Sequence, residues 1–81
     1  MSGPPQSKLL IDFGAAVRSL RQSQGLSQEE FADRVGIHRT YIGDVERGER
    51  NIGLLNVARI ATALHVSLSA LMVEVERQRG A

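Results

Sequence analysis

The apolar positions of the chain fall into five groups, and each group repeats at the spacing of one helical face. In the first group, Leu10, Phe13, Val17 and Leu20 follow one another at intervals of three, four and three residues. This spacing places all four on one side of an α-helix over residues 8–24. Gly25 follows directly and is typical of a helix end, where the backbone turns left-handed. The pattern predicts a first helix whose apolar stripe faces the core.

The second and third groups are short and lie close together along the chain. Ser27, followed three residues later by Glu30, forms a capping box and predicts a helix that begins at residue 28. Gly36 ends this helix, and a third helix is predicted from residue 38 or 39 to residue 47, with Gly48 as its stop. The expected inward positions are Phe31, Ala32 and Val35 in the second helix and Ile42 and Val45 in the third.

Two further groups predict a fourth helix at residues 54–64 and a fifth at residues 68–78, the latter capped by Ser67. His65 stands where the fourth helix ends, and histidine tolerates the left-handed conformation better than most residues. No segment alternates as a strand does, so the sequence predicts an all-α fold. The inner face of the fourth helix comprises Leu54, Val57, Ala58, Ile60, Ala61 and Leu64, and that of the fifth comprises Leu68, Leu71, Met72 and Val75.

Length and composition narrow the class of protein. The 81 residues, 42% hydrophobic and 23% charged, suit one small soluble domain, which we place at residues 8–79. Residues 1–7 contain two prolines and are predicted to be a disordered lead-in. The chain has no cysteine and only two histidines without metal-ligand spacing, so we expect neither disulfide nor metal nor other cofactor. No apolar run could span a bilayer, which predicts a cytoplasmic protein without membrane contact.

The second and third helices form the pattern of a helix-turn-helix, two short helices joined by a turn that contains glycine. Ala32 is small where the third helix is expected to cross, and Gly36 supplies the positive φ of the turn. Gln28, Ile42 and Val45 occupy the remaining positions of the motif. Together, at this spacing, these residues indicate a helix-turn-helix more specifically than any one of them alone.

The stretch S-Q-E-E-F-A-D-R-V-G-I-H-R-T-Y-I-G-D-V-E-R-G-E-R-N resembles the DNA-binding domains of the lambda-repressor-like (XRE) family, and the resemblance extends over residues 8–72. It implies a five-helix fold whose third helix enters the major groove of double-stranded DNA. Within that family, R-T-Y-I followed by E-R-G-E-R-N is similar to the controller proteins of restriction-modification systems. The resemblance also implies an ion pair between Glu46 and Arg21.

Three residues of the third helix are candidates for reading bases. Arg39 lies in the first turn, where a planar guanidinium can pair with guanine O6 and N7. Thr40 offers a hydroxyl to a phosphate or a base and a methyl group to thymine. Asp44, one turn later, could accept a hydrogen bond from cytosine N4 or repel a phosphate.

A second set of residues is expected to contact the DNA backbone. Gln28 opens the second helix, where free amides favour a phosphate. Tyr41 can reach a phosphate with its hydroxyl, and Gly43, which costs about 1 kcal/mol relative to alanine within a helix, would allow close approach to DNA. The resemblance adds Arg47, Arg50 and Asn51 as further phosphate contacts.

Charge alone does not favour a nucleic-acid partner, since the net charge is only +1. Residues 27–50 hold four arginines against six acids. A DNA-binding interpretation must therefore account for the direction in which these acids face. The acids are Glu29, Glu30, Asp33, Asp44, Glu46 and Glu49.

One recognition helix contacts too few base pairs for a unique site, and the family solves this by dimerising over half-sites about one helical turn apart. Val73 lies off the inner face of the fifth helix, which makes that helix apolar on more than one side. We therefore predict a homodimeric transcriptional regulator on a pseudo-palindromic operator, with contact to RNA polymerase as a further expectation. The predicted dimer interface is Leu68, Leu71, Met72, Val73 and Val75.

Two alternatives remain open at the level of the sequence. The chain could be the antitoxin and autorepressor of a toxin-antitoxin pair, or a helical protein-interaction adaptor, which the acids of the helix-turn-helix would suit. An enzyme is not expected, because no acid/base pair or nucleophile constellation is present. The one G-x-x-x-x-G, from Gly43 to Gly48, runs into Glu49 where a phosphate-binding loop needs lysine.

Overall fold

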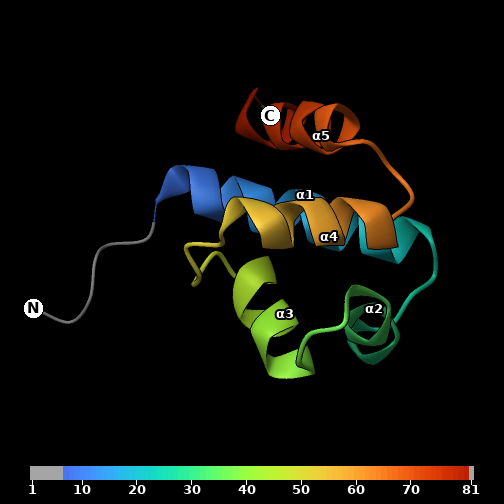
Figure 1. The fold of residues 1–81 in the computed structure, drawn as a ribbon. Helices are drawn as coiled ribbons and strands as arrows, with labels where there is room; N and C mark the ends of the chain where they lie inside the picture. The colour runs from blue at the N-terminus through green and yellow to red at the C-terminus, as the bar shows by residue number, and fades with distance from the viewer. Residues whose placement is uncertain (1–6, 81) are drawn as a thin grey trace, which may run out of the picture.

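The computed structural model describes residues 7–80, which form five α-helices and no strand (Figure 1). The helices are α1 (Lys8–Ser23), α2 (Gln28–Val35), α3 (Arg39–Glu46), α4 (Leu54–Ala63) and α5 (Leu68–Gly80). Their number and order confirm the prediction. The predicted lead-in lies outside the described residues except for Ser7, and there the prediction is wrong, because the Ser7 hydroxyl accepts a hydrogen bond from the Leu9 amide at 3.1 Å and caps α1.

The start of α2 is held by the predicted capping box. The Glu30 amide donates to the Ser27 hydroxyl at 3.0 Å, and the Ser27 amide donates to the Glu30 carboxylate at 2.9 Å. Hydrogen bonding of the Glu30 carboxylate by Ser27, first from its backbone amide and then from its hydroxyl, lowers the pKa of Glu30 below its ordinary value. The turn between α2 and α3 then begins at Gly36, whose φ of 84° is the positive value that the sequence requires there.

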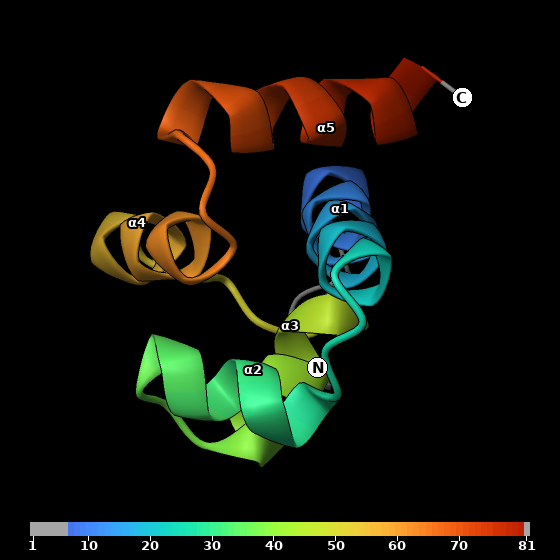
Figure 2. The same cartoon turned by 90° about the vertical axis from the view of Figure 1, so that its right-hand side faces the viewer.

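The core lies where the five helices meet. α1 contacts both α3 and α5, while α2 contacts α3 and α4. In Figure 2, α5 covers one side of α1 and the α2–α3 pair lies on the opposite side. Each helix contributes at least one fully buried side chain to this core, namely Val17, Phe31, Ile42, Ile60, Leu64, Leu71 and Val75. The two short helices therefore rest on a frame made by α1, α4 and α5.

Three residues that were predicted to face the core are exposed instead. Leu54 is 75% exposed because it is the first residue of α4, and that turn extends beyond the core. Leu68 and Met72 are also exposed, and only Leu71 and Val75 of their predicted face are buried. The core-facing stripe of α5 is thus narrower than its apolar pattern indicates. Among the described helices, none taken singly has the length and apolar character to cross a membrane.

Candidate nucleic-acid interface

Helix α3 turns its apolar side inward and its polar side outward from its first residue. His38 is the N-cap, and its ring Nδ1 accepts a hydrogen bond from the Thr40 amide at 3.3 Å. Ile42 and Val45 are buried, while Arg39 and Thr40 are exposed in the first turn. The cap therefore fixes the beginning of the helix at the point where the two candidate base readers stand.

Five of the predicted DNA-contacting residues surround one shallow hollow of about 230 Å³. Arg39, Thr40, Gly43 and Arg47 come from α3, and Gln28 comes from the start of α2. The fold thus gathers on one side of the molecule residues from two helices that the sequence places in separate segments. A surface of this kind can present hydrogen-bond donors to base edges and to phosphates at the same time.

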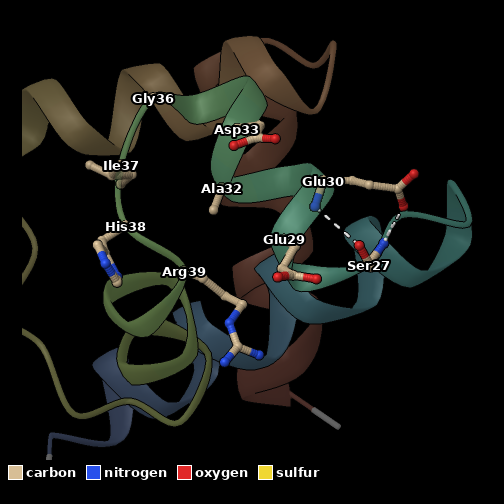
Figure 3. A pocket seen from close by; sticks show the side chains of 9 residues that line it. All are labelled: Ser27, Glu29, Glu30, Ala32, Asp33, Gly36, Ile37, His38 and Arg39. Atoms are coloured by element: carbon tan, nitrogen blue, oxygen red, sulfur yellow. Dashed lines mark hydrogen bonds between the residues drawn. The ribbon is translucent and has the colours of Figure 1, made fainter.

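Arg39 also borders a larger hollow of about 840 Å³ between α2 and the turn that leads into α3. In Figure 3, the Arg39 side chain extends from α3 toward the start of α2, where Glu29 stands. Glu30 and Asp33 line the same hollow. The three acids of α2 are therefore exposed on this side of the motif, and Arg39 lies between them and the smaller hollow.

A buried arginine–carboxylate pair joins the helix-turn-helix to α1. Arg21 donates from Nε to Glu46 Oε2 at 2.6 Å and from Nη2 to Oε1 at 3.0 Å. The side chains of Arg21 and Glu46 are only 9% and 3% exposed. Arg21 also donates to the Leu26 carbonyl at 2.7 Å, and Gln28 donates to Glu46 Oε1 at 3.0 Å. This buried cluster, Arg21, Leu26, Gln28 and Glu46, connects α1, the loop before α2, α2 and α3.

An exposed cluster of arginines and carboxylates occupies the other end of the outer side of α3. Arg47 donates to Asp44 at 2.6 Å and to Glu49 at 3.1 Å, and Arg50 donates to Asp44 at 3.3 Å. The Arg50 guanidinium lies over the Tyr41 ring, 4.9 Å from its centre. The Glu49 hydrogen bond, with Asp44 contributing less, raises the pKa of Arg47. This exposed cluster accounts for two more acids, since both are paired with arginine.

Two predicted backbone contacts have surroundings that the sequence did not indicate. A Cβ on Gly43 would lie 3.2 Å from Arg47 Nη1 and 3.8 Å from Gln28 Oε1. The missing side chain thus makes room for the guanidinium of Arg47, whereas the distance to Gln28 is an ordinary van der Waals contact. Asn51 is exposed but lines a different hollow, which it shares with Leu9 and Leu54, so the fold does not bring it into the group around α3.

The sequence analysis missed the residues that set the position of α3 against α1. A Cβ on Gly14 would lie against the Val45 carbonyl oxygen and 2.6 Å from the Glu46 carbonyl oxygen, so α1 and α3 touch through their backbones. A glycine within a helix costs about 1 kcal/mol relative to alanine, and this cost is the signal that could have singled out Gly14.

The predicted dimer residues divide into two groups. Leu68, Met72 and Val73 are exposed and offer side-chain surface to a second copy. Leu71 and Val75 are buried in the single chain, so the prediction is wrong in offering them to a partner. Their side chains instead fix α5 to the core, where α5 packs against α1 and α4. Met72 lines an apolar hollow of about 300 Å³ with the exposed side chains of Leu9 and Leu54, which extends the exposed apolar surface from α5 onto α1 and α4.

Comparisons of the sequence and of the fold with known proteins agree on the family of this chain. Residues 17–71 match the helix-turn-helix family. The control protein C.MunI of Mycoplasma sp. is 38% identical over 69 residues, which cover 84% of this chain and 93% of that protein. The restriction-modification controller protein C.AhdI of Aeromonas hydrophila is 47% identical in structural alignment, with a TM-score of 0.75 over 76% of this chain and 94% of that chain.

A third similarity links the fold to a structure that contains DNA. The restriction-modification controller protein C.Esp1396I, solved as a tetramer with its natural 35 base-pair operator, has a TM-score of 0.84 to this chain and is 28% identical. The alignment covers 89% of this chain and 95% of that chain. The chain therefore belongs to the helix-turn-helix family of DNA-binding regulators and, within it, to the group of restriction-modification controller proteins.

Proposed function

We propose that this protein is a transcriptional regulator that binds operator DNA through α3 and controls the genes of a restriction-modification system. One observation carries the proposal: the exposed first turn of α3 presents Arg39 and Thr40 beside Gln28 and Arg47, around one hollow. The similarity to a controller protein solved on its operator supports it. The protein acts as a binding module and not as an enzyme, takes no cofactor, and works in the cytoplasm.

The proposed roles of the interface residues follow from where their side chains stand. Arg39 and Thr40 read base edges, because they are exposed at the end of α3 that leads into the major groove. Gln28, Tyr41, Arg47 and Arg50, with Asn51 at greater distance, bind phosphates and hold α3 in register. Three of the six acids do not prevent such contact, since Glu46 is paired with Arg21, and Asp44 and Glu49 are paired with exposed arginines.

We also propose that the regulator binds as a homodimer through the exposed apolar side chains of α5. Leu68, Met72 and Val73 form the centre of this surface, and Leu9 and Leu54 extend it across the adjoining hollow. Burial of these side chains would remove apolar surface from water, which is the main driving force of association. A two-fold axis there would place two copies of α3 over half-sites one helical turn apart.

Fluorescence anisotropy of labelled DNA from the region upstream of the gene tests the DNA-binding proposal. We expect binding that weakens as salt is raised, because phosphate contacts release counterions. Arg39→Ala should weaken operator binding by about 1 to 3 kcal/mol and relax the base preference. Arg77→Ala is the matched control, since Arg77 is also an exposed arginine but lies on α5, where it is paired with Glu74. Binding that ignores salt, or that responds equally to the two substitutions, would contradict the proposal.

A further inference from the structure

Asp44 is the acid whose position on the DNA-facing side of α3 needs an explanation. Its side chain is only 20% exposed, although it lies between two arginines that are 57% and 52% exposed. Oδ1 accepts from Arg47 Nη2 at 2.6 Å, and Oδ2 accepts from Arg50 Nε at 3.3 Å. Both carboxylate oxygens are therefore engaged within the chain and are not simply displayed to a base.

The two arginines that Asp44 holds are the ones proposed to bind phosphates. Arg47 is held from a second side by Glu49, and Arg50 lies over the Tyr41 ring. Two guanidinium groups and two carboxylates make this cluster neutral as a whole. The DNA-free chain thus presents an ordered pair of arginines at this end of α3 but little net positive charge.

A phosphate and a carboxylate compete for the same arginine donors. Both accept charge-assisted hydrogen bonds from the planar guanidinium, often in the same two-pronged geometry. Arginine ion pairs at an exposed surface are weak and exchange readily, because water and salt screen them. The Asp44 carboxylate thus occupies in the free chain the donors that a DNA phosphate would use.

We propose that Asp44 is a positioning residue that restrains DNA affinity: it holds Arg47 and Arg50 in the DNA-free chain and must yield them before they can bind phosphates. The inference rests on the proposed function of this surface. DNA of arbitrary sequence supplies phosphates alone and gains little by displacing two internal ion pairs. Operator DNA adds the contacts of Arg39 and Thr40, which offset that displacement. Asp44 therefore lowers the affinity for all DNA, and lowers it for operator DNA at least as much as for other DNA, because the operator complex bears the full cost of the displacement.

The test compares Asp44→Asn with the unchanged protein, full-length in both cases, on operator DNA and on scrambled DNA of equal length and composition. Asparagine keeps the size of the side chain and removes the charge that holds the arginines. We expect binding to scrambled DNA to tighten by about three- to thirtyfold, the range that two exposed ion pairs can supply. Operator binding should tighten by at least the same factor, and the salt dependence on scrambled DNA should become steeper by roughly one phosphate contact.

Two controls separate this mechanism from a general loss of negative charge. Asp33→Asn removes an exposed acid of α2 and should change both affinities by less. The second control repeats Asp44→Asn in a chain that already carries Arg47→Gln and Arg50→Gln, as a mutant cycle. If Asp44 acts through the two arginines, its substitution should have no further effect on affinity in that background.

Each outcome assigns the failure to one proposal. If Asp44→Asn leaves both affinities unchanged, or if its effect persists without the two arginines, the inference about Asp44 is overturned while DNA binding stands. If the unchanged protein shows no salt-sensitive binding to either DNA, the proposed function fails first. Circular dichroism of each variant checks that the helices are retained.

Discussion

Helix α3 carries two arginine–carboxylate clusters that differ chiefly in their access to water. Glu46 points inward and is held by Arg21 with both oxygens, at 2.6 and 3.0 Å. Asp44, two residues earlier, points outward and is held by Arg47 and Arg50 at 2.6 and 3.3 Å. The lengths of the bonds hardly distinguish the clusters, whereas the arginine of the buried pair is 9% exposed and those of the outer pairs are 57% and 52% exposed.

Both clusters are arginine–carboxylate pairs, but because one is buried and the other is exposed they have different roles. A buried charge that loses its partner cannot recover hydration, so the inner pair is permanent and fixes α3 against α1. An exposed pair loses little when water or another anion replaces one partner. The buried cluster therefore holds α3 in the position that the DNA interface requires. The exposed cluster can exchange its carboxylates for phosphates when DNA binds.

The largest effect is expected from breaking the inner cluster. Glu46→Ala leaves Arg21 buried without its carboxylate and should lower the free energy of unfolding by about 3 to 5 kcal/mol. Urea denaturation followed by circular dichroism measures this change. Asp44→Ala, as the control on the outer side, should lower the same free energy by less than about 1 kcal/mol. Equal losses for the two substitutions would show that burial does not separate the clusters.

A smaller loss of stability is expected from breaking the capping box at the start of α2, because this box is exposed to water. Ser27→Ala removes the acceptor for the Glu30 amide and should cost about 1 kcal/mol of stability. The measurement is again urea denaturation at neutral pH. A cost near zero would mean that water replaces the serine hydroxyl without loss.

The capping box should also affect how the free energy of unfolding changes with pH. Because Ser27 lowers the pKa of Glu30, the contribution of Glu30 is present above its ordinary value of 4.5 and is lost as the pH falls through the lower, folded-state value. Denaturation between neutral and acidic pH should therefore show a smaller decline for Glu30→Gln, whose side chain does not titrate, than for the unchanged chain. Parallel declines would contradict this assignment.

The sequence predicts those parts of the fold that depend on local signals. The capping box, the left-handed glycines and the helical spacing gave five helices whose ends lie within two residues of the observed ones. Leu54, Leu68 and Met72 were misassigned because helical spacing defines a face but not how far the core extends beneath it. Gly14 was missed because its role depends on a backbone contact with α3, which no local pattern records.

In the candidate site, too, features set by local sequence could be predicted, and features set by tertiary contacts could not. The first-turn position of Arg39 and Thr40 and the pairing of Glu46 with Arg21 could be anticipated, the latter only through family resemblance. The partners of Asp44 could not be anticipated, since an acid that accepts a hydrogen bond from a base and an acid that holds two arginines look identical in sequence. The separation of Asn51 from the group around α3 likewise depends on the path of the chain after Gly48.

The most direct measurement makes one conservative change, arginine to lysine, in each cluster and records both stability and DNA affinity. Lysine keeps the charge but lacks the planar fork that serves two oxygens. Arg21→Lys should lower the free energy of unfolding and leave the operator affinity of the folded protein nearly unchanged. Arg47→Lys should leave stability within about 0.5 kcal/mol, as surface substitutions usually do, and weaken operator binding. If Arg47→Lys destabilises the fold as much as Arg21→Lys does, or if it leaves DNA affinity unchanged, this assignment of roles is contradicted. In that case the buried side of α3 is not the structural side and its exposed side is not the DNA-binding side.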